Sequence, residues 1–470
     1  MIHRYALPLA LGLLAAGDVA RLPAQSGRLA APLAVRIDSV FRRFTAPGSP
    51  GCALGVARDG ALVYSKGYGL ASVELGVPIT PATVFEIGSV SKQFTAMSVV
   101  LLAQDGKLSL DDQIQRFIPE VPRYARPVTI RHLLHHTSGL RDYIEILGWS
   151  GIGEEAVTTD QDALDAIARQ TGTNFEPGAE FLYSNSGFFL LSVIVKRAAG
   201  ESLRAFAARR IFQPLGMTHT QYVDRHDMIV PGKAGSYADG AAGGFVLALA
   251  NWEQTGDGAV NTTVEDLAKW DGNFVTGTVG GPAAIHELET PGVLNSGSAI
   301  EYALGLNVDS YRGVRRVSHG GSWAGFRAQL TRFPGQQLSI FTLCNLASSA
   351  PGFLAGSVAD LLLRDAASGG QVWTPRPAAA EPRAWSREAL AALVGVYHSD
   401  ELLADLVVTL RNDSLFVRPG LGAEIPLRPT AGEAFSAFGT RVTPVLAAGR
   451  VTGLTLNNRG LRDFRLSRAP

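Results

Sequence analysis

A serine and a lysine three positions apart, Ser89 and Lys92, are the residues of this sequence best suited to do chemistry. Gly88 precedes them, and the apolar residues that follow at helical spacing predict a turn that leads into a helix. Positions three apart on a helix share a face, so the lysine would lie one turn below the serine. A serine hydroxyl needs a neighbouring base to become a strong nucleophile, and a desolvated lysine can be that base. The pair therefore predicts nucleophilic catalysis, although the same spacing also occurs by chance at solvated helix starts.

A second segment with suitable polar groups is Tyr183-Ser184-Asn185, which follows a predicted turn. A phenol held near Lys92 could move protons to and from the serine and the leaving group. An asparagine amide can bond both a lysine ammonium and a substrate carbonyl. Taken alone, the segment also fits an ordinary aromatic residue beside a turn.

The third segment is His319-Gly320-Gly321-Ser322, at the end of a predicted strand. Glycines at this place would let a substrate backbone approach the strand edge closely. The backbone N–H of Ser322 would then join that of Ser89 to form an oxyanion hole. A bulge or a turn would explain two glycines beside a strand equally well.

Together, the three segments follow the order Ser-x-x-Lys, Ser/Tyr-x-Asn and Lys-Thr-Gly that is typical of β-lactamases and penicillin-binding proteins. The sequence thus resembles the serine β-lactamase and penicillin-binding-protein superfamily. Within it, the sequence looks most like the branch of class C β-lactamases, DD-carboxypeptidases, D-aminopeptidases and related esterases. The resemblance extends over residues 30–365 and rests on five stretches, Phe85–Lys92, His136–Leu140, Tyr183–Asn185, Pro214–Met217 and His319–Phe326.

This resemblance implies roles for individual residues. The catalytic residues would be Ser89 as the acylated nucleophile, with Lys92 and Tyr183 sharing the acid and base work. Which of the two is the base stays open. The residues that the resemblance assigns to substrate binding are Asn185, His319, Gly320, Gly321 and Ser322.

One departure from the family pattern concerns the third segment, which has His319 where many β-lactamases have lysine and Gly320 where threonine is usual. A lysine would be a permanent cation, whereas a histidine with an ordinary pKa of about 6.5 is mostly neutral at pH 7. We therefore expect weak recognition of a β-lactam carboxylate, which improves as the pH falls towards 6. The alternative is that an arginine such as Arg327 supplies the missing charge.

The two cysteines, Cys52 and Cys344, are too few for a disulfide framework or a four-thiolate zinc site. In the resembled fold, the first and last strands of the sheet pair antiparallel, which would bring these cysteines side by side. A disulfide and two packed free thiols remain open as alternatives.

We expect no metal and no other cofactor. His135-His136 lacks the partners of a His-Glu-x-x-His zinc site and is interpreted as a pair packed on a helix. The segment His319-Gly320-Gly321 also resembles the oxyanion loop of lipases. An α/β-hydrolase would need a Gly-x-Ser-x-Gly nucleophile turn, however, and the sequence contains none.

The composition indicates a large folded protein without a preference for polyanions. Of its 470 residues, 46% are hydrophobic and 18% are charged, which is sufficient for a sizeable buried core. The formal net charge of +0 gives no reason to expect nucleic acid or an anionic membrane surface as a partner. The expected partner is a small-molecule or peptide substrate, and the oligomeric state is left open.

Strand patterns near both ends of the main region, with helical patterns between them, predict an α+β fold with one antiparallel sheet. The resemblance adds helices that flank the sheet and a helical region across the cleft. The strands predicted for this sheet are Cys52–Ala57, Ala61–Tyr68, Val314–Ser318, Ala328–Phe333 and Leu338–Leu346.

A Pro/Ala-rich segment, Ser368 to Trp385, indicates a domain boundary. Beyond it, short strand patterns separated by turns predict a small all-β barrel. Its predicted strands are Gly395–Tyr397, Leu406–Leu410, Ser414–Arg418, Glu424–Leu427, Val442–Ala447, Val451–Asn457 and Leu461–Leu466. The predicted organisation is a signal segment 1–24, a β-lactamase-like hydrolase domain 29–367, a linker 368–386 and a β-barrel domain 387–470.

The first 24 residues predict export. The basic pair His3-Arg4 precedes the apolar run Tyr5–Gly17, which is too short for a stable membrane span, and small residues at Ala20 and Ala24 offer cleavage edges. We expect a signal peptide rather than an uncleaved anchor or a buried helix. The mature protein would then be periplasmic or extracellular, without a membrane anchor.

These observations favour a secreted serine hydrolase that cleaves amide or ester bonds through a covalent acyl-enzyme. Peptides with D-amino acids and small esters are the substrates that the resemblance implies. One alternative is a β-lactamase that degrades antibiotics. Another is a penicillin-binding or sensing module that is acylated without turnover, or a scaffold that binds through its C-terminal domain.

Overall fold

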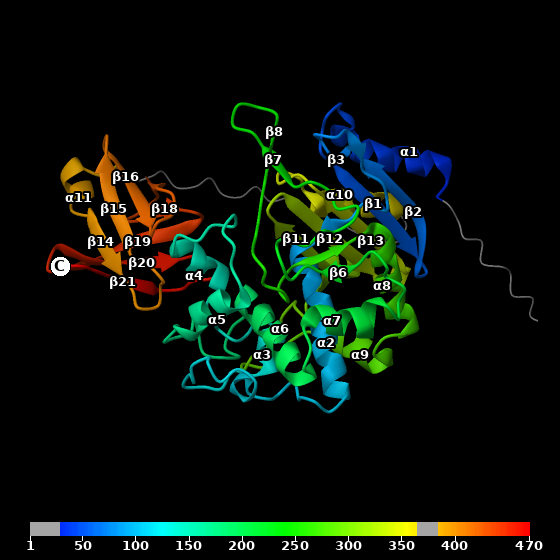
Figure 1. Ribbon diagram of the computed structural model, residues 1–470, viewed down its shortest axis with the longest axis horizontal. Coiled ribbons are helices and arrows are strands. Elements are labelled where there is room, and N and C mark those ends of the chain that lie inside the picture. The colour runs from blue at the N-terminus through cyan, green and yellow to red at the C-terminus, as the bar shows by residue number, and fades with distance from the viewer. Residues whose placement is uncertain (1–28, 364–383) are drawn as a thin grey trace, which may run out of the picture.

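The computed structural model describes residues 29–363 and 384–470, which form a sheet-and-helix part and a separate barrel (Figure 1). The predicted signal segment 1–24 and residues 368–383 of the predicted linker lie outside the described residues. In Figure 1 the barrel lies on the left, and α4 (Tyr143–Trp149) is the helix of the larger part that approaches it.

A six-stranded antiparallel sheet organises the larger part, in the order β10-β11-β12-β13-β1-β2. Its strands are β1 (Cys52–Arg58), β2 (Ala61–Tyr68), β10 (Asn307–Tyr311), β11 (Val314–Trp323), β12 (Phe326–Phe333) and β13 (Leu338–Cys344). Early strands thus pair with late ones, which confirms the predicted sheet built from both ends of this region. β11 runs five residues further than predicted, so the segment from His319 to Ser322 lies inside the strand.

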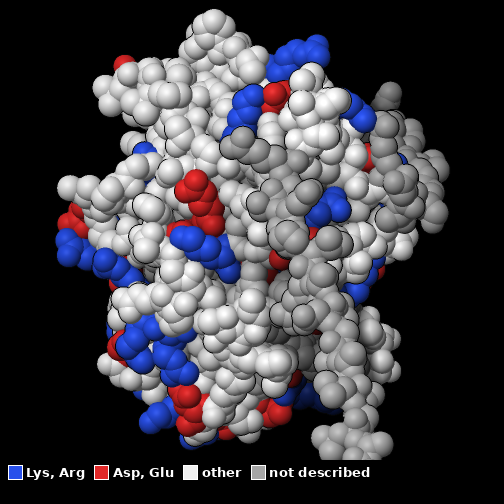
Figure 2. Space-filling view, turned by 90° about the vertical axis from the view of Figure 1, so that its right-hand side faces the viewer, with Lys and Arg blue, Asp and Glu red and all other residues white. Residues whose placement is uncertain are grey.

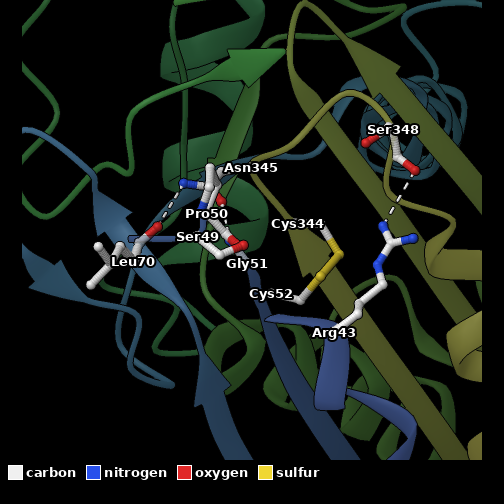
Figure 3. The surroundings of a disulfide bond; sticks show 9 residues. All are labelled: Arg43, Ser49, Pro50, Gly51, Cys52, Leu70, Cys344, Asn345 and Ser348. Atoms are coloured by element: carbon white, nitrogen blue, oxygen red, sulfur yellow. Dashed lines mark hydrogen bonds between the residues drawn. A yellow bond between two sulfur atoms is a disulfide. The ribbon is translucent and has the colours of Figure 1, made fainter. Parts of the chain in front are cut away.

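The two cysteines are directly opposite each other where β1 begins and β13 ends. Cys52 and Cys344 form a disulfide, with their Cα atoms 4.0 Å apart. The prediction that they lie side by side is therefore confirmed, and of the two alternatives the disulfide is the one present. Figure 3 shows that Asn345, next in the chain, accepts a hydrogen bond from the Gly51 N–H and donates one to the Leu70 carbonyl oxygen.

Helices cover both faces of the sheet, because alternate strand residues on each face are apolar. α1 (Ala31–Val40) and α10 (Pro351–Leu362) pack over one face, with Leu54 and Val56 of β1 pointing into that core. α8 (Val264–Thr276) packs over the other face, and Thr263 caps its N-terminus by accepting from the Asp266 N–H.

The helical region lies below the sheet in Figure 1 and surrounds α2 (Lys92–Gln104), whose first eleven residues are buried. α2 packs against α6 (Asn185–Ala199) and α9 (Gly281–Leu288). The other helices of this part are α3 (Ile130–Leu134), α4, α5 (Asp160–Ala168) and α7 (Leu203–Ala207).

Short strands connect the sheet to the helical region. β5 (Phe85–Glu86), β9 (Val260–Thr262) and β6 (Gln221–Tyr222) form a three-stranded sheet that leads directly into α2. The remaining pairs are β3 (Leu70–Ser72) with β4 (Val77–Pro78), and β7 (Tyr237–Asp239) with β8 (Phe245–Leu247).

The C-terminal part follows α11 (Arg387–Ala391) and is a closed antiparallel barrel. Its strands are β14 (Gly395–His398), β15 (Leu406–Arg411), β16 (Ser414–Pro419), β17 (Ile425–Pro429), β18 (Phe435–Ala437), β19 (Thr440–Ala447), β20 (Arg450–Asn457) and β21 (Phe464–Arg468). The fold class predicted from the sequence, an α+β domain plus an all-β barrel, is therefore confirmed. The sequence patterns missed the short strand β18.

Charged side chains of both signs are interspersed on the face shown in Figure 2, where blue and red groups lie side by side. Among residues 29–363 and 384–470, no helix combines the length and the apolar character needed to span a bilayer.

Candidate active site

Ser89 is held at a tight turn between β5 and α2. This turn is a 3₁₀ helix, Gly88–Ser91, and Gly88 adopts a positive φ of 48°. A Cβ atom at Gly88 would lie 2.7 Å from the backbone nitrogen of Ser322 on β11. Glycine is needed here both for the backbone conformation and for the close approach of the turn to the strand. The turn places Ser89 on the wall of a cleft.

Lys92 is the first residue of α2 and is fully buried beneath Ser89. Its Nζ atom lies 3.0 Å from Ser89 Oγ, 2.9 Å from Asn185 Oδ1 and 2.7 Å from the carbonyl oxygen of Asp257. The carbonyl and amide oxygens can only accept, so a neutral Lys92 would donate its two hydrogens to them. Its lone pair would then face the Ser89 hydroxyl, which is the arrangement a general base requires.

The charge state of Lys92 is set by opposing effects. Burial lowers its pKa from the ordinary lysine value to about 8, while the carboxylates of Asp257 and Asp142 oppose that shift. With a pKa of about 8, roughly one molecule in ten has a neutral Lys92 at pH 7, and in that molecule Lys92 can take a proton from Ser89.

Asp142 fixes the orientation of Asn185. One carboxylate oxygen of Asp142, Oδ2, accepts from the backbone N–H of Asn185 (2.8 Å) and from its Nδ2 (2.9 Å). Because the amide nitrogen is held this way, the amide oxygen must face Lys92. The other oxygen, Oδ1, caps α4 by accepting from the Ile144 N–H at 3.0 Å. Burial raises the pKa of Asp142. The sequence reading missed this residue.

Asp257 is a second buried carboxylate that the sequence reading missed. Its backbone carbonyl binds Lys92, and its side chain accepts a hydrogen bond from the Tyr143 hydroxyl at 3.0 Å. Burial raises its pKa, and the nearby ammonium group of Lys92 opposes that shift. Both aspartates lie in segments rich in turn residues, which was the only signal in the sequence. Because aspartates in such segments usually cap turns, this signal does not indicate a role in a catalytic site.

Tyr183 lines the cleft beside Ser89. Its hydroxyl is buried beside that of Ser89, and its ring lies 4.8 Å from Lys92 Nζ. Burial raises the pKa of the phenol well above its ordinary value, with the Ser89 hydroxyl opposing that shift. Tyr183 is therefore protonated at neutral pH, so the open choice of base favours Lys92, with Tyr183 as a proton donor.

Two histidines and a tyrosine form a buried chain behind Tyr183. The Ser184 N–H donates to His136 Nδ1 (3.2 Å), so this histidine carries its proton on Nε2 and donates to the Tyr302 hydroxyl (3.1 Å). His319 must donate from Nδ1 to the Gly320 carbonyl oxygen (2.6 Å), so its Nε2 accepts from Tyr302 (3.0 Å). Every group in the chain is satisfied with both histidines neutral. The His136 ring also packs 4.2 Å from that of Tyr183.

This chain changes the interpretation of His319. The side chain is buried, and burial together with the nearby Lys92 lowers its pKa to about 4. The expectation that His319 gains charge as the pH falls towards 6 is therefore wrong. Arg327 is not among the residues that line the cleft. Its guanidinium donates to the carbonyl oxygens of Ala324 and Phe326 and acts electrostatically on the carboxylate of Glu154, which does line the cleft.

Gly321 of β11 allows close packing of the strand against the nucleophile turn. A Cβ atom at Gly321 would lie 1.9 Å from the Ile87 carbonyl oxygen, so glycine lets the strand contact the turn. Ser322 lines the cleft together with Ser89, which suits the predicted pair of oxyanion-hole N–H groups. Gly320 instead lines a separate hollow beside Gln329.

The cleft has a volume of about 220 Å³ and a distinctive lining. Glu86 and Glu154 provide carboxylates, and the rings of Trp252 and Trp323 pack edge to face at 5.6 Å. No lysine or arginine is among the described residues that line it. Of the acidic groups, Glu86 is paired with Lys233 at 3.2 Å. The lining therefore favours a cationic or neutral substrate over an anionic one.

Other candidates from the sequence lie elsewhere. Ser91, the other serine of the nucleophile turn, is buried and accepts from the Val260 N–H, so it is not available as a nucleophile. His135 is buried with its Nδ1 against the Tyr302 carbonyl oxygen. Within the part of the chain that the structure describes, no three His, Cys, Asp or Glu side chains are grouped to hold a metal ion.

Several known proteins are similar to this chain in sequence or in fold. The sequence pattern of the family described as Beta-lactamase matches residues 37–364. Penicillin-binding protein 4* of Bacillus subtilis (strain 168) is 31% identical over 309 residues, which are 62% of this chain and 66% of that protein. A D-aminopeptidase of Gluconobacter oxydans (strain 621H) is 28% identical over 326 residues, which are 69% of this chain and 61% of that protein. The chain thus spans less than two thirds of the length of these curated relatives.

Two solved structures show how far the likeness in fold extends. The octameric penicillin-binding protein homologue from Pyrococcus abyssi is 25% identical with a TM-score of 0.63, and the match covers 92% of this chain and 99% of that one. The D-amino acid amidase from Ochrobactrum anthropi SV3 is 22% identical with a TM-score of 0.58, covering 71% of this chain and 99% of that one. At that identity, the second likeness concerns the fold alone.

Proposed function

This chain belongs to the beta-lactamase family, and we propose that it is a serine hydrolase that cleaves amides or esters through an acyl-enzyme on Ser89. The observation that carries the proposal is the environment of Lys92 Nζ, 3.0 Å from the Ser89 hydroxyl and otherwise bonded to two oxygens that can only accept. Such a lysine, with its pKa lowered by burial, is suited to remove the serine proton.

The proposed reaction proceeds in two balanced steps. Ser89 Oγ attacks the substrate carbonyl carbon while its proton passes to Lys92, and the N–H groups of Ser89 and Ser322 bind the oxyanion. Tyr183 donates its proton to the leaving amine or alcohol and regains one from Lys92. A water molecule then attacks the ester with the same groups acting in reverse, which releases the acid and restores the serine.

We further propose that preferred substrates carry a free amino group next to the scissile bond. The carboxylate of Glu154 and the rings of Trp252 and Trp323 can attract an ammonium group. Burial raises the pKa of this carboxylate, whereas Arg327, which lies outside the described lining, acts on the same carboxylate and lowers its pKa. The names of the relatives support D-amino acids in this position, since several are D-aminopeptidases. Amides and short peptides with an N-terminal D-residue are therefore the proposed class.

The same features do not favour the alternatives. A β-lactam presents a carboxylate, whereas His319 is buried and neutral and Arg327 is bonded elsewhere. The grouping of Ser89, Lys92, Tyr183 and Asn185 favours turnover over a module that is only acylated, and the deacylation rate distinguishes the two, because a trapped adduct would indicate the module. Export to the periplasm or the extracellular space remains part of the proposal, and the disulfide supports it, because such bonds persist in oxidising compartments.

The test is a hydrolysis screen of the purified protein, with D- and L-phenylalanine p-nitroanilide, their N-acetylated forms, p-nitrophenyl acetate and a chromogenic cephalosporin. We expect the free D-anilide to be cleaved fastest. N-acetylation should lower kcat/KM by about ten- to a hundredfold, the worth of one charge-assisted hydrogen bond. Glu154→Gln should remove most of this discrimination. A cephalosporin hydrolysed faster than every ester and anilide would contradict the proposal.

Ser89→Ala provides the control for the nucleophile. Loss of the covalent route should lower kcat by several orders of magnitude, while substrate affinity changes little. A fluorophosphonate probe should label the wild-type peptide that contains Ser89, as read by mass spectrometry. An adduct on Ser91 would show that the assignment of Ser89 as the nucleophile is wrong, and the mechanism would then be rejected.

A further inference from the structure

A second cavity, of about 410 Å³, lies between α4 and the barrel. The larger part contributes Ile144, Trp149 and Ile152 to its wall. The barrel contributes five residues from the β16–β17 region and the β18–β19 turn, Pro419, Gly422, Ala423, Ile425 and Phe438. Most of these side chains are apolar, so the cavity offers an apolar surface formed by two parts of the fold.

This interdomain cavity adjoins the catalytic cleft. Ile144, Glu154 and Trp252 line both spaces. A substrate bound at Ser89 that extends past these three residues would reach the interdomain cavity. Only the first of the two hollows contains the catalytic groups.

The barrel is fixed in the position that forms this wall. Trp149 donates from its indole nitrogen to Thr440 Oγ1 at 3.1 Å, and Phe438 packs edge to face on the same indole at 6.2 Å. Arg141 pairs with Glu401 at 2.6 Å, and the side chains are only 10% and 12% exposed. The barrel therefore contacts α4 through a buried hydrogen bond and an aromatic pair as well as through this ion pair.

Phe438 shows that an apolar surface remains available to a ligand. It is 64% exposed although it is a large apolar residue beside the cavity, and its backbone has a positive φ of 50°, which is uncommon for phenylalanine. The sequence places an apolar ring at a turn where asparagine or glycine would fit the backbone better. Contact with an apolar ligand gives a physical reason for that choice.

We propose that the interdomain cavity is an extended subsite that binds an apolar chain of the substrate, beyond the group next to the scissile bond. The inference rests on the proposed hydrolase function and adds the C-terminal barrel as the element that selects for chain length. The chain would belong either to the acyl group or to the leaving group, since both are attached at the carbonyl carbon in front of Ser89.

The test uses two substrate series with the full-length protein. One series varies the acyl chain of p-nitrophenyl esters from acetyl to decanoyl, and the other varies the amine of D-alanine n-alkylamides from methyl to octyl. In the series whose chain enters the cavity, kcat/KM should rise by about fourfold per methylene once the chain passes Trp252, the value for burying one CH₂. In the other series, kcat/KM should not change with chain length. The comparison therefore shows whether the acyl group or the leaving group carries the bound chain.

Two variants and a matched control locate the effect. Ala423→Trp fills the cavity from the barrel side, and Phe438→Asn removes its apolar ring while suiting the positive φ. Both should bring the ratio of long-chain to short-chain kcat/KM towards one. Leu421→Trp, two residues from Ala423 on a side chain that is 100% exposed, adds the same ring outside the cavity and should behave as the wild type.

The experiments distinguish rejection of the subsite from rejection of the proposed hydrolase function. If short substrates are turned over but the chain-length ratio is flat in both series, or is unchanged in Ala423→Trp, the subsite is rejected and the hydrolase stands. If no substrate is turned over, calorimetry of n-butylamine and n-octylamine with Ser89→Ala still decides. Tighter binding of the octyl chain that is lost in Ala423→Trp supports the subsite, and equal binding of the two amines overturns it.

Discussion

At the residue scale, the groups around the amino group of Lys92 determine how the site can work. Its three oxygen neighbours come from three elements, the nucleophile turn, the start of α6 and the loop before β9. One of these neighbours, the Asn185 amide, is held by the buried Asp142, and another is the backbone carbonyl of the buried Asp257. The position of the proton on Lys92 therefore depends on residues that never touch the substrate.

We predict the pH dependence of the reaction from this environment. Lys92 must be neutral to act as a base, and its pKa is about 8, so kcat/KM should rise with pH and level off above about 8. His319, with a pKa of about 4, should contribute no step near pH 6.5. The measurement is kcat/KM of a neutral ester from pH 5 to 10. An inflection near 6.5 that disappears in His319→Gln would contradict this assignment.

Asp142 gives a second prediction at this scale. In Asp142→Ala, the Asn185 amide is free to rotate, so Lys92 loses a defined acceptor and kcat should fall about a hundredfold, as expected when a catalytic group is misplaced by an ångström. Removal of this carboxylate should also lower the pKa of Lys92 and shift the rising limb of the pH profile to lower pH. Asp142→Glu keeps the charge, so the rising limb of its pH profile should lie where it does in the wild type, while kcat stays below the wild-type value. A fall in kcat with an unmoved limb would indicate a purely structural role.

The sequence could reveal only the part of this site that occurs in recognisable motifs. Ser89, Lys92, Tyr183 and Asn185 stand in short patterns with fixed spacing, and the structure brings them together. Asp142, Asp257 and Tyr302 act through burial and long-range contacts, which no local pattern encodes. The pKa of His319 was misjudged for the same reason, because burial cannot be read from a single residue type.

At the element scale, the loop between β20 and β21 of the barrel contacts the residue that precedes α4. The Asp142 N–H donates to the Gly460 carbonyl oxygen at 3.1 Å, and Asn174 Nδ2 donates to the same oxygen at 3.0 Å. A Cβ atom at Gly460 would lie 2.6 Å from Asp142 Cβ. A barrel loop thus contacts the residue that orients Asn185 and, through it, Lys92.

We therefore predict that Gly460→Ala lowers activity from outside the catalytic site. The added methyl must displace Asp142, so kcat should fall by about tenfold, whereas KM for a short ester should change less. The φ of Gly460 is not positive, so backbone strain does not confound the result. Gly335→Ala, where nothing lies within 4 Å of the added atom, is the control. If both variants match the wild type in kcat, the loop does not position the site.

Element boundaries were predictable where a single rule applied. The strands β1 and β2 and most barrel strands follow from turn residues and alternation. β11 was predicted too short, because its glycines mimic a strand end, whereas Gly321 lies there so that the strand can pack on the Ile87 carbonyl. Close packing between distant elements overrode the local signal.

At the scale of the whole molecule, the architecture was predictable but the contact between its parts was not. Composition changes marked the barrel as a separate unit, and the family resemblance supplied the sheet. Neither indicated that α4 would meet the barrel, because that interface combines residues about 300 positions apart, such as Glu145 and Asn458. The proposed subsite and the contact of Gly460 with Asp142 both arise from this interface.

Glu145 at this interface provides the last prediction. It accepts a hydrogen bond from Asn458 Nδ2 at 2.6 Å, and burial, with the nearby Asp142, raises its pKa to about 7. A carboxyl group whose folded pKa lies above its unfolded value binds more protons when folded. Its contribution to stability is therefore fully present below about pH 4.5 and is lost as the pH rises to about 7.

We expect the free energy of unfolding to fall by about 1–3 kcal/mol over this interval through Glu145 alone. Glu145→Gln keeps an oxygen that can accept from Asn458 but cannot ionise, so the variant should be more stable than the wild type at pH 8 and nearly equal at pH 4.5. Glu388→Gln is the matched control, because Glu388 also lies in the first turn of a helix but is exposed. The measurement is denaturant unfolding of the three proteins at both pH values. A Glu145→Gln difference that is the same at pH 4.5 and pH 8 would show that ionisation of Glu145 does not oppose docking of the barrel.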